Sequence, residues 1–181
     1  MGKLLLSLGL GVVGAGIVHI AILLLLPSLA ERGPWQRLAA TAGHYRFVAV
    51  NGENAPSSPT IRPVDPFFDE AACRFDLRDG VVHIHAPGHV PFWSMSVYDR
   101  RGENIYSLTD RTATDGDLDL VIATPAQLIE VKKDIPNDFE KSIFVETDTR
   151  KGIALVRSLI PDGSWAPGID RYMKGLVCQS G

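Results

Sequence analysis

Charge is nearly absent from the first 26 residues of the chain. Lys3 is the only Lys, Arg, Asp or Glu among them, although the 181 residues include 18 Lys plus Arg and 21 Asp plus Glu. As a helix, the 23 uncharged residues of Leu4–Leu26 are long enough to cross a hydrocarbon core about 30 Å thick. The remainder has the composition of a globular protein, which excludes a disordered, collagen-like or coiled-coil chain. We therefore expect one membrane-spanning helix joined to one folded domain.

A cleavable signal peptide is the alternative for this segment, because Ser28, Leu29 and Ala30 form the small-x-small pattern of a cleavage site. The apolar run is longer than the roughly 7–15 residues of a signal-peptide core, which favours an uncleaved anchor over residues 1–27. Positive charges on the two sides nearly balance and do not decide its orientation. The very short extension before the helix favours a cytoplasmic N-terminus and a periplasmic domain, in a single-pass protein of the inner membrane.

Small residues and one histidine share a face of this segment, because Ser7, Gly11, Ala15 and His19 recur every four residues. Small side chains let a second helix approach closely, and an ionisable side chain within a membrane tends to face protein. This face is a candidate helix–helix interface with another single-pass membrane protein or a second copy of the chain. The alternative is that Gly and Ala are simply common in membrane helices.

The sequence also lacks the motifs of several enzyme classes. It has no Gly-x-Ser-x-Gly elbow, no phosphate-binding or dinucleotide-binding glycine loop, and no His-Glu-x-x-His helix. It has no run of Lys and Arg, so nothing indicates a nucleic-acid partner. We therefore assign no catalytic residue and expect no cofactor.

Cysteine is scarce, since Cys73 and Cys178 are the only two. On the periplasmic side they would meet an oxidising compartment, and we predict a disulfide between them. It would close a loop of about 105 residues, which in the chain-entropy model stabilises the fold by roughly 4–5 kcal/mol. The alternative is two separate buried thiols.

Two segments precede the main domain. Residues 34–42 carry apolar side chains at helical spacing, with Pro34 suited to the first turn, and predict a short juxtamembrane helix. Residues 51–66 are rich in Pro, Ser, Gly and Asn and have no hydrophobic period, which is typical of a linker. We expect the anchor at 1–27, the helix and linker at 28–66, and the β domain at 67–181.

The hydrophobic period is two from Cys73 onward, which indicates β-strands. Asp79-Gly80 and Gly102 mark two turns, each between a pair of alternating segments, and so predict two hairpins. Thr124–Gln127 fits the start of a helix with a capping box. The further strands are expected at residues 117–122, 142–146 and 153–160. About seven short strands predict a mainly all-β fold, an antiparallel β-sandwich with one or two short helices.

Histidines cluster near the second strand. His83 and His85 share one face of it, and the Pro-Gly bend that follows could return His89 toward them, which makes the three a candidate metal site. The alternative is surface histidines, because Val82 and Ile84 make the opposite face the core face.

Four other side chains are candidates for binding a polar ligand or a glycan. Asp110 and Arg111 follow a hairpin strand, where a carboxylate and a guanidinium could hold such a ligand; the alternative is that they organise their own turn. Trp93 lies at one of the alternate strand positions that are expected to face the core. Tyr98 and Trp165 are therefore the better exposed aromatic candidates.

Several stretches resemble small, membrane-anchored members of the bacterial domain-of-unknown-function family twelve-fifty-four (DUF1254). They are Ala72–Leu77, Pro91–Asp99, Gly102–Arg111, Thr124–Gln127 and Arg157–Pro161, and the resemblance spans nearly the whole chain. It implies an envelope location, a β-rich, jelly-roll-like domain and, as partner, a sister single-pass protein often encoded beside it. It implies no reaction.

Our functional hypothesis is a non-enzymatic accessory protein of the inner membrane, whose periplasmic domain binds another component of the cell envelope. The alternative is an envelope enzyme or ligand-binding domain that acts on a glycan or a small polar molecule.

Overall fold

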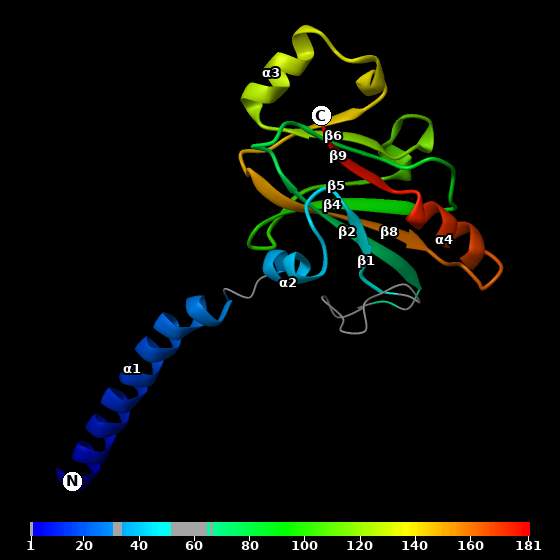
Figure 1. Cartoon of the computed structure of the whole chain (residues 1–181). Coiled ribbons are helices and arrows are strands. Elements are labelled where there is room, and N and C mark those ends of the chain that lie inside the picture. Colours follow the sequence, from blue (N-terminus) through cyan, green and yellow to red (C-terminus); the bar gives the residue numbers. More distant parts are fainter. Residues whose placement is uncertain (1, 31–33, 52–64, 66) are drawn as a thin grey trace. The chain divides into compact units, whose positions relative to one another are not determined.

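The computed structural model describes residues 2–30, 34–51, 65 and 67–181 (Figure 1). The chain divides into two compact units, Met1–Gly33 and Pro34–Gly181. The predicted linker therefore lies largely outside the described residues.

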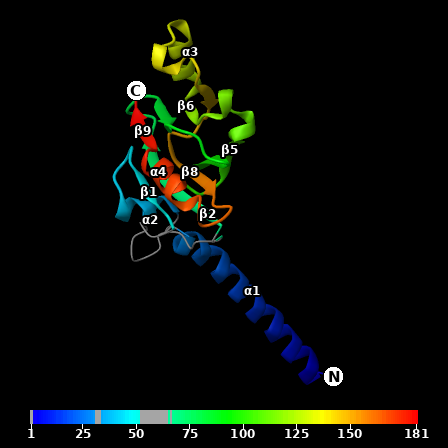
Figure 2. The same ribbon diagram turned by 90° about the vertical axis from the view of Figure 1, so that its right-hand side faces the viewer.

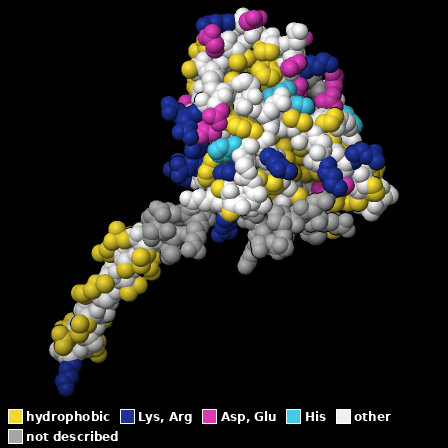
Figure 3. Space-filling model, viewed as in Figure 1, with side chains coloured by type: hydrophobic (Ala, Val, Ile, Leu, Met, Phe, Trp, Pro, Cys, Tyr) yellow, Lys and Arg dark blue, Asp and Glu magenta, His cyan; other side chains and the backbone are white. Residues whose placement is uncertain are grey.

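The first unit is the helix α1, Gly2–Ala30. Its segment Gly2–Leu25 is long and apolar enough to cross a membrane. Hydrophobic side chains lie along the helix (Figure 3), and those of Leu4 and Leu24 are 70% and 73% exposed. An apolar helix with this exposure fits a membrane anchor or a signal peptide.

The second unit consists of two β-sheets and a few short helices. In spatial order, the five-stranded sheet contains β1 (Phe47–Ala49), β2 (Phe68–Asp76), β8 (Lys151–Leu159), β4 (Trp93–Asp99) and β5 (Asn104–Thr109). The four-stranded sheet contains β7 (Ile143–Glu146), β6 (Asp119–Ala123), β3 (Val82–His85) and β9 (Val177–Ser180). The helices are α2 (Pro34–Thr41), α3 (Pro125–Lys133) and α4 (Ala166–Lys174), with 3₁₀ turns η1 (Asp110–Thr112), η2 (Thr114–Gly116) and η3 (Asn137–Phe139).

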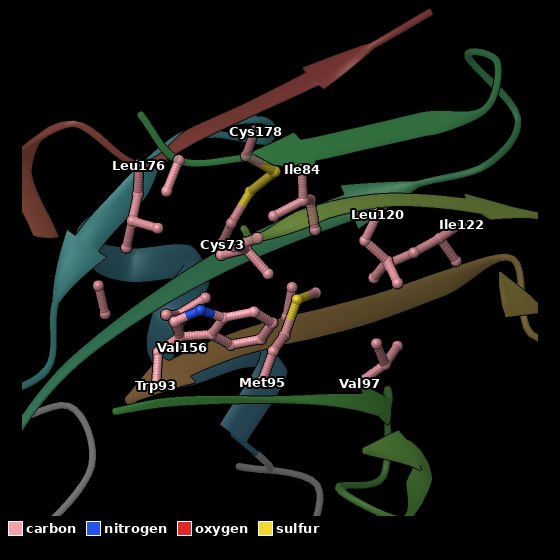
Figure 4. Close-up of a cluster of buried hydrophobic side chains, with 14 of the residues drawn as sticks. Cys73, Ile84, Trp93, Met95, Val97, Leu120, Ile122, Val156, Leu176 and Cys178 are labelled. Carbon is pink, nitrogen blue, oxygen red and sulfur yellow. A yellow bond between two sulfur atoms is a disulfide. The ribbon is translucent and has the colours of Figure 1, made fainter. Parts of the chain in front are cut away.

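One core is formed by side chains from both sheets (Figure 4). Strand β4 alternates buried and half-buried residues, so Trp93, Met95 and Val97 all enter this core. Ile84 and Leu120 enter it from the other sheet. Trp93 is 1% exposed, and its indole N–H donates to the carbonyl of Gly116 at 2.8 Å. The alternation in the sequence thus identified the core face of this strand.

Smaller apolar clusters cover the outer face of each sheet. Leu38 of α2 packs with residues of β2 and β8 on the five-stranded sheet. Leu128 of α3 and Phe139 of η3 pack with Val121 on the four-stranded sheet. Because both faces are covered, β2 is buried at seven consecutive positions rather than at every second one.

The predicted disulfide is present between Cys73 of β2 and Cys178 of β9. The two Cα atoms are 6.6 Å apart, and the residues are separated by 105 positions. The bridge joins the two sheets, because β2 belongs to one and β9 to the other (Figure 4).

The mainly β fold and the N-terminal apolar helix are confirmed, as are the helices α2 and α3. The capping box of α3 is formed by Thr124 and Gln127, whose side-chain oxygens each accept a hydrogen bond from the other residue's backbone N–H. Two other predictions are wrong.

The sheets were expected to be antiparallel throughout, but strands β6 and β7 are parallel, because α3 carries the chain back before β7 begins. The turn at Asp79-Gly80 joins β2 to β3, which lie in different sheets, so it is no hairpin. Period-two alternation identifies the buried face of a strand but not the strand beside it.

Candidate functional site

His83 is buried in the outer cluster of the four-stranded sheet and is only 5% exposed. Its Nε2 lies 2.9 Å from Oδ1 of Asp119, and the Ser142 hydroxyl donates to the same oxygen. The ring of Phe139 meets the imidazole edge-on, with 4.9 Å between centroids. The alternative of surface histidines is therefore wrong for His83, because η3 covers the face of β3 that lies opposite the main core.

His85 stacks on His83, with ring centroids 4.7 Å apart. Burial lowers the pKa of His85, and the neighbouring His83 lowers it further. His89 lies elsewhere, with Nδ1 3.5 Å from Oδ1 of Asp117 and an exposed side chain. Nowhere in the described parts of the chain do three or more His, Cys, Asp or Glu form a group that could hold a metal ion. The structure thus pairs two of the three predicted ligands and leaves the third apart.

Of the four predicted ligand-binding residues, Tyr98 lies apart from Asp110 and Arg111. Tyr98 pairs with Asn104, whereas Thr109, which precedes Asp110, pairs with Ser94 near the other end of the β4–β5 hairpin. Tyr98 is half-buried and packs against the α2 cluster. The other three differ in exposure: Asp110 is half-buried, Arg111 is exposed, and Trp165, at the start of α4, is 47% exposed.

A groove that the sequence did not indicate lies where β1, the beginning of β2, α4 and β9 meet. Its volume is about 810 Å³, which is within the range of about 300–1,000 Å³ for ligand sites. Figure 2 views the domain from the side on which α4 lies, with β1 and β9 nearby. The apolar part of its lining includes Tyr45, Phe47, Ala49, Ala71, Met173, Leu176 and Val177. Cys178 also lines it, so the disulfide lies at the edge of the groove.

Three carboxyl groups belong to the same groove and differ in their partners. Glu70 is 4% exposed, and its Oε1 accepts a hydrogen bond from Nε of Arg157 at 2.7 Å. Asp170 is paired with Lys174 of the same helix, 2.8 Å away. Asp69 is in no salt bridge with any described residue. Burial raises the pKa of Asp69, and the negative charge of Asp170 raises it further.

The groove lies between two strand edges. β1 is the last strand of its sheet and β9 is the last strand of the other, so among the described strands each has a neighbour on one side only. Edge strands present backbone N–H and C=O groups that can pair with another chain. The groove therefore combines apolar walls, a carboxyl group without a salt bridge to any described residue, and unused backbone pairing capacity.

The face of α1 with Ser7, Gly11, Ala15 and His19 is exposed in this single chain. The Ser7 hydroxyl donates to the carbonyl of Leu4, 3.0 Å away, within the same helix. An added Cβ at Gly11 would meet nothing within 4 Å. The interface with a second helix stays a prediction.

The chain is thus a protein of two β-sheets on a shared core, with an apolar helix at its N-terminus. It belongs to the family described as "Protein of unknown function (DUF1254)", whose profile matches residues 70–180. The predicted family is therefore confirmed.

Two solved structures are similar to the chain. The VPA0106 protein from Vibrio parahaemolyticus has a TM-score of 0.58 at 10% identity, with 84% of this chain and 36% of that one covered. An uncharacterized protein from Burkholderia cenocepacia has a TM-score of 0.47 at 16% identity, with 77% and 38% covered. This chain spans about a third of the length of the Vibrio protein, with which it shares the fold. No curated protein matches the sequence.

Proposed function

We propose that the chain is a single-pass inner-membrane protein whose periplasmic, jelly-roll-like β-sandwich binds another component of the cell envelope. The observation that carries the proposal is the groove between β1, α4 and β9, with two strand edges beside it that no other described strand covers. The apolar helix α1 supplies the anchor in this proposal, and its small-residue face is the second contact with a partner.

Binding without catalysis is favoured by the groups that line the groove. The described lining residues include no Ser and no His, and the sulfur of Cys178 is held in the disulfide. Glu70 forms an ion pair with Arg157, and Asp170 forms one with Lys174. The Tyr45 hydroxyl also lines the groove and donates to Oδ2 of Asp79 at 2.7 Å, but burial raises its pKa to about 12, so it is not the activated nucleophile that group-transfer enzymes need.

One observation favours the alternative function, an enzyme or binding domain for a glycan or a small polar molecule. Asp69 and Asp170 interact electrostatically in the groove, and the carboxyl of Asp69 gains its proton more readily than an ordinary aspartic acid. A carboxyl group with a raised pKa beside a second carboxyl group is an arrangement used for general acid–base chemistry on glycosidic bonds.

Photo-crosslinking in native membranes tests the binding proposal. A photoreactive amino acid at position 173, which lines the groove, should give one discrete adduct. The matched control is position 129 on α3, where Ile129 is 64% exposed and away from the groove, and it should give none. Adducts at neither position, or equal adducts at both, would contradict the groove as the binding site.

The second contact is tested separately by single cysteines in α1. Positions 7, 11, 15 and 19 should form intermolecular crosslinks, whereas positions 13 and 17 on another face should not. Crosslinking without dependence on the face would remove the helix interface and leave the groove untouched.

A further inference from the structure

We propose that the groove receives an extended polypeptide segment of the envelope partner, which pairs with the free edge of β1 as an added strand. The inference rests on the proposed function and names the chemical class of the ligand.

The pairing pattern of β1 shows which of its backbone groups are directed outward. In the register with β2, Val48 lies opposite Ala72, and the N–H of Val50 donates to the carbonyl of Glu70 at 2.8 Å. Hydrogen-bonded and non-hydrogen-bonded positions alternate along an antiparallel pair, so Val48 and Val50 point their backbone groups toward β2. The N–H and C=O of Phe47 and Ala49 therefore point away from β2.

These outward groups have no hydrogen bond to any backbone group outside β1 and β2 in the described residues. They recur at every second residue along the strand, which is the spacing at which another β-strand offers its own donors and acceptors. Sugar hydroxyls and acyl chains have no such repeat. The edge therefore favours a polypeptide over a glycan or a lipid.

The walls of the groove indicate what side chains the added strand would carry. Phe47 and Ala49 on one side and Met173 and Leu176 on the other are apolar, which suits apolar side chains at alternate positions. Asp69 lines the same groove and has no salt bridge to a described residue, so a Lys or Arg at an intervening position would give it a partner. We expect a segment with alternating apolar residues and one basic residue.

Selection of peptides on the full chain in lipid nanodiscs tests this inference. The probe is a phage-displayed library of random linear peptides, and a selected peptide is then synthesised in two forms. One form carries N-methyl groups on one set of alternate backbone amides, and the other form carries them on the complementary set. An added strand uses only one set, so one form should lose at least about tenfold in affinity while the other retains it.

A protein variant gives a second measurement. Ala49→Pro removes one outward N–H and leaves the bonds between β1 and β2, so peptide affinity should fall about tenfold with little change in melting temperature. Val48→Pro is the matched control, because it removes an inward N–H and should lower the melting temperature.

The outcomes separate the two proposals. Equal affinity of the two methylated forms, or no selected peptides, overturns strand addition. If peptides are selected whose two methylated forms bind equally, and these peptides compete with the adduct at position 173, the groove remains the binding site of the proposed function. If Met173→Glu leaves peptide binding unchanged, the peptides do not occupy the groove and strand addition is overturned, whereas the proposed function is decided by the adduct at position 173.

Discussion

The histidine cluster, defined as His83, His85, Asp119, Phe139 and Ser142, and the groove beside β1 contain similar polar groups in opposite surroundings. In the cluster, one carboxylate oxygen is the partner of both His83 and Ser142, and aromatic rings fill the remaining space. In the groove, Asp69 lines the cavity, and no other described strand pairs with the outer edge of β1. The residue types most typical of a binding site thus lie in the packed region, whereas ordinary residues form the open one.

The largest expected effect concerns the bridge beside the groove. The variant C73A/C178A should lower the free energy of unfolding by about 4–5 kcal/mol, because the disulfide closes a long loop in the unfolded chain. Urea unfolding measures the change. In the variant, backbone amide hydrogen exchange should become faster in β9, next to the groove, than in β6, next to the histidine cluster. An unchanged unfolding midpoint would contradict the stabilising role of the bridge.

Replacing a histidine tests how closely the cluster is packed. His83→Ala should lower the free energy of unfolding by about 2–3 kcal/mol, since it removes buried ring contacts and the hydrogen bond to Asp119. His89→Ala is the matched control, because His89 is exposed, and it should change stability by less than about 0.5 kcal/mol. Equal effects of the two substitutions would show that the cluster is not a packed unit.

This contrast explains what the sequence could and could not predict. Features that depend on neighbours in the chain were predicted, such as the core face of β4, the β4–β5 hairpin and the capping box of α3. The disulfide was predicted because only one pair of cysteines exists. Family resemblance added the family but no site.

The groove could not be predicted, because segments far apart in the sequence form it. β1 has three residues, too few for a visible alternation, and it lies within the range 28–66 expected to precede the β domain. The N-cap residue of α4 is Trp165, whose side chain makes no capping hydrogen bond, and Pro167 and Gly168 lie in the first turn, so the sequence carries no clear signal for the start of this helix. The burial of His83 was missed for the same reason, since Phe139 comes from a distant 3₁₀ turn.

The pH dependence of stability should have opposite signs in the two regions. The pKa of His85 is lowered in the folded cluster, so between that value and the ordinary value of about 6.5 the unfolded state binds more protons. The contribution of His85 to stability is therefore lost as the pH falls through this interval. Asp119 and Asp138, which face His85, oppose this shift without reversing it. Urea unfolding measured across this interval should show that the free energy of unfolding falls less steeply with falling pH in His85→Gln than in the unaltered protein. The same dependence on pH in both proteins would contradict this prediction.

The smallest effect on stability is expected in the groove itself. The pKa of Asp69 is raised, so the folded state favours its protonated form, and the associated stability is lost as the pH rises through the folded pKa. Asp69→Asn removes this titration and the repulsion with Asp170, and should change the free energy of unfolding at neutral pH by no more than about 0.5 kcal/mol. The same variant should weaken binding of a peptide with a Lys or Arg several-fold, because the charge partner is lost. Asp148→Asn, at an exposed position outside the groove lining, is the control in both measurements and should change neither. A large loss of stability in Asp69→Asn would mean that the groove is as closely packed as the histidine cluster, and the distinction between the two regions would no longer hold.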